Sequence, residues 1–138
     1  MSDSPSSSDP ADIQEPVPIE GRRLAVTAQA LYLLNLLFPL LPLLALAGIA
    51  MLHSGRGVPL ARNHLRQGLA GAILSSLLFI AANLLIITQG GYRSMAALVV
   101  FELYYVLVVP LLLVPGLIGI LRAISGREFQ FPLLGRFL

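Results

Sequence analysis

Residues 24–52 read LAVTAQALYLLNLLFPLLPLLALAGIAML and carry no acidic or basic side chain. About 30 Å of hydrocarbon is crossed by roughly 20 helical residues, and two crossings would take about 40. This stretch therefore predicts one transmembrane helix. Because proline removes a backbone donor and clashes with the preceding turn, Pro39 and Pro42 are expected to kink or tilt that helix.

Two further apolar stretches follow, at residues 68–88 and 95–121, and each is long enough for one span. The last contains Pro110 and Pro115, which predict another kink and leave a re-entrant break open as an alternative. The whole chain is 57% hydrophobic and 12% charged, whereas a soluble domain carries about 25% charged residues. We therefore predict an all-α integral membrane bundle of three transmembrane helices.

The segments outside these spans differ in composition. Residues 1–23 are rich in Ser, Pro, Asp and Glu, which predicts a disordered acidic tail because such a segment buries too little apolar surface to offset its ordering entropy. Its acidic start argues against a secretory signal. Residues 24–138 form the predicted membrane domain. Within it, residues 122–138 alternate arginine with Phe and Leu, which indicates a segment lying at the membrane interface.

The arginines predict an orientation, since positive charge is retained on the cytoplasmic side. With three spans, six arginines fall on one side and three on the other. The larger group is Arg56, Arg62, Arg66, Arg122, Arg127 and Arg136, and the smaller is Arg22, Arg23 and Arg93. This predicts a multi-pass protein of the bacterial cytoplasmic (inner) membrane, with its N-terminus outside and its C-terminus in the cytoplasm.

Small residues recur at spacings of three and four along the second span. The candidate helix-packing face consists of Gly68, Ala72, Ser75 and Ser76. Small side chains let helix backbones approach closely in a membrane. We therefore expect a contact between helices here, with a polar pathway along the same face as the alternative.

Glu102 is the only carboxylate inside a predicted span. A charge at that depth is costly and normally faces protein or water. Asn83 and Asn35 are close enough in predicted depth to form a candidate intramembrane polar site with it. Such a site would line a cavity or contact a partner subunit. Alternatively, a protonated Glu102 hydrogen-bonds Asn83 and only stabilises the bundle.

The sequence shows no constellation for catalysis or cofactor binding. It has no cysteine, glycine-rich phosphate loop, nucleophile elbow or carboxylate pair. His53 and His64 are the only histidines and lie far apart along the chain, so neither a metal nor a haem site is expected. No basic run interleaved with aromatic residues indicates nucleic-acid binding. We therefore predict a protein that is not an enzyme, with no cofactor and no nucleic-acid partner.

Two stretches resemble a known family. Residues 61–69 (ARNHLRQGL) and 123–132 (AISGREFQFP) are similar to the ends of spans in small bacterial membrane proteins of a domain-of-unknown-function family. That family is related to the Tic-twenty component of protein import across the chloroplast inner envelope. The resemblance singles out five positions, namely His64, Gln67, Gly126, Phe129 and Pro132. It implies a translocation-related role rather than a defined activity.

Both motifs fall on the predicted cytoplasmic side, so we expect His64 or Gln67 to hydrogen-bond the C-terminal segment. Gly126 suits the turn after the last helix. The predicted function is a non-catalytic structural, assembly or translocation-related membrane component. It would act in the lipid bilayer with other membrane subunits or as a homo-oligomer. Two alternatives are an oligomeric small-solute channel or transporter using Glu102, and an accessory subunit of a membrane enzyme or respiratory complex.

Overall fold

The computed structural model describes residues 19–53, 58–127 and 130, and every regular element in them is helical. The elements in chain order are α1 (Ile19–Leu37), α2 (Leu41–His53), α3 (Pro59–Thr88), α4 (Met95–Leu103), the π-helical turn η2 (Tyr104–Val108) and α5 (Val109–Ile124). The all-α class is therefore confirmed. The predicted acidic tail lies outside the described residues, apart from its last few positions.

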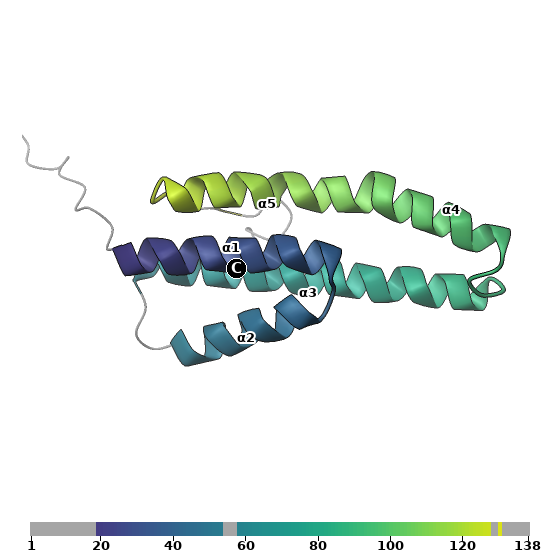
Figure 1. Cartoon of the computed structure of the whole chain (residues 1–138), viewed down its shortest axis with the longest axis horizontal. Helices are drawn as coiled ribbons and strands as arrows, with labels where there is room; N and C mark the ends of the chain where they lie inside the picture. The colour runs from purple at the N-terminus through teal and green to yellow at the C-terminus, as the bar shows by residue number, and fades with distance from the viewer. Residues whose placement is uncertain (1–18, 54–57, 128–129, 131–138) are drawn as a thin grey trace, which may run out of the picture.

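The first apolar stretch forms two helices joined by a tight turn, so the prediction of a single kinked span is wrong. The chain reverses at residues 38–40, and α2 runs back alongside α1 (Figure 1). Pro39 has no N–H to donate the next hydrogen bond of α1. Pro42 lies in the first turn of α2, where backbone N–H groups have no partner within the helix, so a proline is tolerated. Leu40 completes the reversal with a φ of 81°.

The last apolar stretch shows the opposite behaviour. Elements α4, η2 and α5 form one continuous helix of 30 residues, Met95–Ile124. The π-helical turn lies directly before Pro110, and the N–H of Val109 bonds the carbonyl of Tyr104. Such single turns accommodate a local change in the backbone bonding pattern without ending a helix. No break occurs between Pro110 and Pro115.

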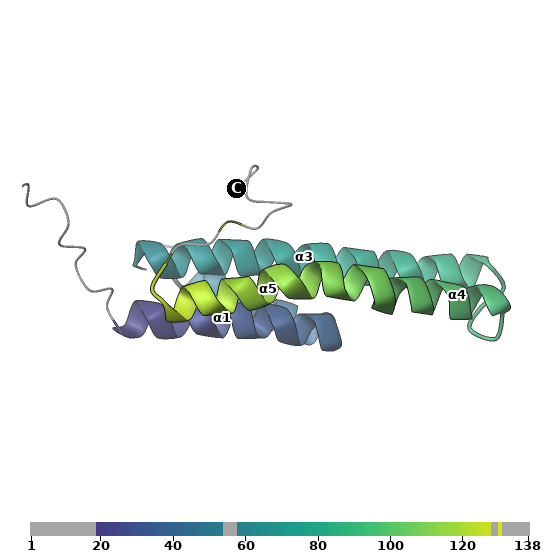
Figure 2. The same ribbon diagram turned by 90° about the horizontal axis from the view of Figure 1, so that it is seen from above.

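Helix α3 is the long axis on which the others are arranged (Figures 1 and 2). Helices α1 and α2 both contact its first half. Helix α5 contacts α1 and α3, on the side opposite to α2. The start of α1, the end of α2, the start of α3 and the end of α5 share one end of the bundle. We call it the arginine end, because its exposed arginines are Arg22, Arg23, Arg62, Arg66, Arg122 and Arg127.

This arrangement differs from the one expected for three successive spans. The reversal at Pro39 returns the chain to the end from which it started. Ala25 of α1, Leu60 of α3 and Ala123 of α5 consequently form one small buried cluster. Thus α1 begins at the same end of the bundle as α3, not at the opposite end. Among the described arginines, only Arg93 lies at the other end, in the turn between α3 and α4, which we call the far end.

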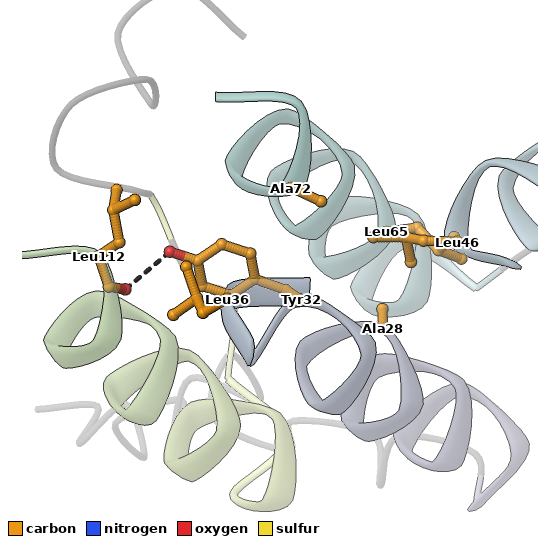
Figure 3. Packing of buried hydrophobic residues seen from close by; sticks show 7 residues of the cluster. All are labelled: Ala28, Tyr32, Leu36, Leu46, Leu65, Ala72 and Leu112. Atoms are coloured by element: carbon orange, nitrogen blue, oxygen red, sulfur yellow. Dashed lines mark hydrogen bonds between the residues drawn. The ribbon is translucent and has the colours of Figure 1, made fainter. Parts of the chain in front are cut away.

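The main core lies in the half of the bundle where α1, α2, α3 and α5 meet (Figure 3). Its buried members are Ala28, Tyr32, Leu36, Leu46, Leu65, Ala72 and Leu112. Beyond the end of α1, only α3 and α4 continue side by side. The fold is therefore a closed bundle at one end and a helix pair at the other.

Two helices are long and apolar enough to cross a membrane, Pro59–Thr88 and Met95–Ile124. In their most apolar windows only 28% and 17% of the residues are buried inside the structure. A core helix of a soluble protein would be mostly buried, whereas these helices expose many large apolar side chains, on α3 from Ile73 onward. The structure thus has two long apolar helices and a helical hairpin in place of the three predicted spans.

Candidate functional site

Three polar side chains of α1 lie on one face of the helix and are completely buried. Gln29, Tyr32 and Asn35 follow one another at intervals of three residues and are 1%, 0% and 0% exposed. Buried polar groups are costly unless they are hydrogen-bonded, and more so where no water reaches them. Within the described residues, each buried side-chain nitrogen and oxygen has a partner. We call this set of contacts the polar seam.

Asn35 connects three helices. Its Nδ2 donates to the carbonyl of Ala72 (3.1 Å) and to the hydroxyls of Ser75 (2.9 Å) and Ser76 (3.1 Å) on α3. Its Oδ1 accepts from the backbone N–H groups of Leu40 and Leu43, each at 3.2 Å. These two N–H groups belong to the turn and the first turn of α2, where a helix has no partners of its own. Asn35 therefore caps α2 from α1 and fixes both helices to α3.

Two glycines of α5 admit the other polar side chains of α1. A Cβ at Gly116 would lie 2.6 Å from Cε1 of Tyr32, and one at Gly119 would lie 2.6 Å from Oε1 of Gln29. The Tyr32 hydroxyl donates to the carbonyl of Leu112 at 2.7 Å (Figure 3). Any side chain at Gly116 or Gly119 would occupy this space. The close contact between α1 and α5 therefore requires glycine at both positions.

His64 of α3 joins the seam to the end of α5. Its Nδ1 lies 3.2 Å from Nε2 of Gln29, and its Nε2 lies 2.9 Å from the carbonyl oxygen of Arg127. A carbonyl only accepts, so Nε2 carries the proton and donates, and Nδ1 accepts from the Gln29 amide. The neutral imidazole thus bridges α1 and the segment after α5. The expected hydrogen bond between His64 and the C-terminal segment is present.

The position of the Arg127 carbonyl is set by the turn at Gly126. This glycine has a φ of 68°, and its N–H bonds the carbonyl of Ala123, while the N–H of Arg127 bonds the carbonyl of Arg122. These two bonds and the left-handed glycine form a Schellman motif, which ends a helix. The predicted role of Gly126 in the turn is confirmed. Phe129 and Pro132 lie outside the described residues.

The candidate packing face of α3 is buried and directed at α1. Gly68 lies close to the backbone of α1, since a Cβ there would be 3.1 Å from the carbonyl oxygen of Ala28. Ala72, Ser75 and Ser76 contact Asn35 as described above. Gln67 is also buried, at 4% exposure. These residues form a contact between helices, which is the first of the two interpretations that the sequence allowed.

The structure does not bring the candidate polar residues Glu102, Asn83 and Asn35 together. Asn83 bonds its own helix through the carbonyl of Phe79 (2.7 Å) and accepts from the hydroxyl of Tyr92 (2.6 Å) in the far turn. Glu102 is exposed on α4. Asn35 is enclosed in the seam. Two of these residues thus belong to the far end and one to the closed bundle.

Some residues of the seam were not singled out from the sequence. Tyr32, Gly116 and Gly119 are the main examples. The sequence contains a pattern that predicts the polar seam, because Gln29, Tyr32 and Asn35 repeat at the spacing of one helix face inside an apolar stretch. The glycine pair at spacing three on α5 indicates close helix approach for the same reason. The described residues contain no group of three or more His, Cys, Asp or Glu that could hold a metal ion.

Comparisons with known proteins place the chain in a family. The model of the Magnetosome magnetite crystal formation protein family matches residues 20–138. No curated protein and no solved structure matches the chain. The interpretation that linked the motifs around His64 and Gly126 to Tic-twenty-related proteins is wrong, since both motifs lie within the region that this family model matches. The chain belongs to the Magnetosome magnetite crystal formation protein family.

Proposed function

We propose that this protein is a non-catalytic component of the magnetosome membrane that takes part in magnetite crystal formation. The observation that carries the proposal is the family match over residues 20–138. It is supported by two long apolar helices that expose many large apolar side chains, along α4–η2–α5 and along the second half of α3. Lipid is the medium in which such a surface is stable.

The arrangement of the helices supports a topology for this protein. Helices α3 and α4–η2–α5 cross the bilayer, while the α1–α2 hairpin enters and leaves at the arginine end. Six exposed arginines of the described residues lie at that end and one, Arg93, lies at the other. By the positive-inside rule the arginine end faces the cytoplasm. The far end, with the turn at Gly90 and Gly91, then faces the opposite side of the membrane.

Helix length supports the same placement and would put Glu102 at a membrane interface, in reach of water. Arg122 and Glu102 are 20 residues apart on one continuous helix, which is about 30 Å at about 1.5 Å per residue. This equals the thickness of the hydrocarbon, about 30 Å. Both charged groups can therefore reach water at opposite interfaces, and the exposed carboxylate needs no partner within the membrane.

The described residues supply no arrangement for bond-breaking chemistry, so we propose that the protein acts through contacts. The closed bundle holds α3 rigidly and lets α3 and α4 project toward the far side as a pair. The exposed apolar surface of this pair is available to other membrane subunits or to a second copy. The channel alternative requires Glu102, Asn83 and Asn35 to share a cavity, and their separation in the structure does not favour it.

The proposal is tested by removing the protein from a magnetosome-forming bacterium and measuring crystal size and number by electron microscopy. We expect smaller or misshapen crystals, restored by the full chain. Normal crystals would contradict the proposed role.

Topology is tested separately, using the absence of cysteine from the chain. Ser125→Cys and Gln89→Cys place single thiols at the arginine end and the far end. We expect a membrane-impermeant maleimide to label only Gln89→Cys from the non-cytoplasmic side. Labelling of both, or of Ser125→Cys alone, would contradict the orientation.

A further inference from the structure

A groove between α2 and α3 has not been used by any contact described so far. It has a volume of about 260 Å³ and is lined by Ala50, His53, Arg62, Leu65, Arg66 and Leu69. We call it the α2–α3 groove. Its lining residues belong to α2 and α3, and none of them is a member of the polar seam.

The two ends of the groove differ in polarity. Arg62 and Arg66 are exposed and one helical turn apart on α3, so their guanidinium groups lie on the same side of that helix. His53 ends α2 at the same end of the bundle. The remaining lining residues, Ala50, Leu65 and Leu69, are apolar. Ala50 lies about one turn farther from the arginine end than His53 on α2, and Leu69 lies about one turn farther than Arg66 on α3. Cationic groups thus surround one end and aliphatic side chains line the other.

Positive charge predominates around the groove. Among the described residues, the arginine end carries six arginines and a single carboxylate, Glu20 at the start of α1. Guanidinium groups bind phosphate oxygens in a bidentate manner. A free phosphate would use the cationic end alone and leave the aliphatic floor unoccupied. A molecule with a phosphate and a hydrocarbon chain would match both parts.

We propose that the α2–α3 groove binds one anionic phospholipid, with its phosphate at Arg62 and Arg66 and an acyl chain along Ala50, Leu65 and Leu69. The inference rests on the membrane placement proposed above, because the groove then lies where the headgroup region meets the hydrocarbon. The bound lipid would also cover the face of α3 that the short helix α2 leaves open.

The test uses the purified full chain in mild detergent and measures bound lipid by native mass spectrometry. The probes are phosphatidylglycerol, phosphatidylcholine and inorganic phosphate. We expect phosphatidylglycerol to bind at least about tenfold more tightly than phosphatidylcholine. The double variant Arg62→Gln/Arg66→Gln should lose about tenfold or more, since each arginine that contacts the lipid phosphate contributes about a fewfold to affinity.

Matched variants separate the groove from general charge. Arg22→Gln/Arg23→Gln removes the same charge at the same end of the bundle, outside the groove, and should change binding less than twofold. Ala50→Leu fills the floor without changing charge and should weaken phosphatidylglycerol binding several-fold, which keeps the test valid if the double arginine variant fails to fold. Excess inorganic phosphate should compete only weakly.

Three results would overturn the proposal. These are equal losses for the two arginine pairs, equal binding of the two lipids, and complete displacement of phosphatidylglycerol by inorganic phosphate. Membrane fractionation of the same variants distinguishes this failure from failure of the proposed function. If the protein stays in the membrane and only the lipid result is negative, the groove assignment alone is wrong.

Discussion

Two asparagines on neighbouring helices show how the two ends of this molecule differ. Asn35 lies in the closed bundle, joins α1 to α2 and α3 through side-chain and backbone hydrogen bonds, and is 0% exposed. Asn83, at the far end, bonds a carbonyl of its own helix and a tyrosine of the adjoining turn. In the closed bundle the tertiary structure depends on polar contacts between helices. At the far end each helix is largely satisfied locally, and its apolar surface is left for lipid or a partner.

The largest effect is expected from a side chain placed between α1 and α5. In Gly116→Leu, the Cβ alone would lie 2.4 Å from Cδ2 of Leu33 and 2.6 Å from Cε1 of Tyr32. Because neither a tyrosine ring nor the packed α5 backbone can move aside cheaply, we expect a loss of about 3 kcal/mol in the free energy of unfolding. Thermal unfolding in detergent, followed by circular dichroism, measures it.

The control for this variant is a second glycine in a helix. Gly48 of α2 has no atom within 4 Å of a built Cβ, so Gly48→Leu changes helix propensity and little else. We expect it to be neutral or slightly stabilising. Equal destabilisation by the two leucines would show that α5 is not packed on α1 as described.

The next effect compares the asparagines directly. Asn35→Leu leaves the N–H groups of Leu40 and Leu43 without their partner and removes the bonds to Ser75 and Ser76. We expect a loss of about 2 kcal/mol, and increased trypsin access to the α1–α2 hairpin. Asn83→Leu should cost less than about 1 kcal/mol, since its bonds are local or exposed. A larger cost for Asn83→Leu would reverse the assignment of the two ends.

The comparison also explains what the sequence could and could not predict. Hydropathy identified the helical class and the long helices around Ser75 and Leu112. Lipid selects apolar side chains on a helix independently of which other helices that helix contacts. It did not identify the reversal at Pro39. A stretch of 29 residues fits one tilted span, and the hairpin depends on tertiary contacts such as those of Asn35 with Leu40 and Leu43.

The same reversal bears on the predicted orientation, because the arginines were assigned to two sides on the assumption that residues 24–52 form one span. In contrast, the motifs around His64 and Gly126 predicted a contact between distant segments correctly. A left-handed glycine and a buried histidine have narrow structural requirements. Their spacing carries more information about tertiary contacts than leucine-rich stretches do, even though the family first inferred from them was wrong.

A smaller effect is expected at the junction of α3 and the C-terminal segment. His64→Ala removes the bonds to Gln29 and to the Arg127 carbonyl. A hydrogen bond of about 1 kcal/mol holds the Arg127 turn closed, so we expect trypsin cleavage after Arg127 to become about fivefold faster. Cleavage after Arg93 in the far turn of the same molecule is the internal reference and should not change. His53→Ala, whose ring bonds only its own helix at Ile49 among the described contacts, should have no effect on either rate.

The smallest effect is expected from Glu102→Gln, although this residue is the only acid in the predicted spans. Its side chain is exposed on α4, and in the proposed topology its distance of about 30 Å from Arg122 puts it where the hydrocarbon ends. Replacing a solvated carboxylate by an amide removes no contact of the bundle, so we expect thermal stability to change by less than about 0.5 kcal/mol. Crystal formation in cells complemented with this variant should also be unchanged. A marked gain in stability would instead place the carboxylate in lipid, where its charge is costly, and loss of crystal formation at normal stability would show that a partner or an ion uses it. Either result would make the far end, rather than the polar seam, the functional centre of the molecule.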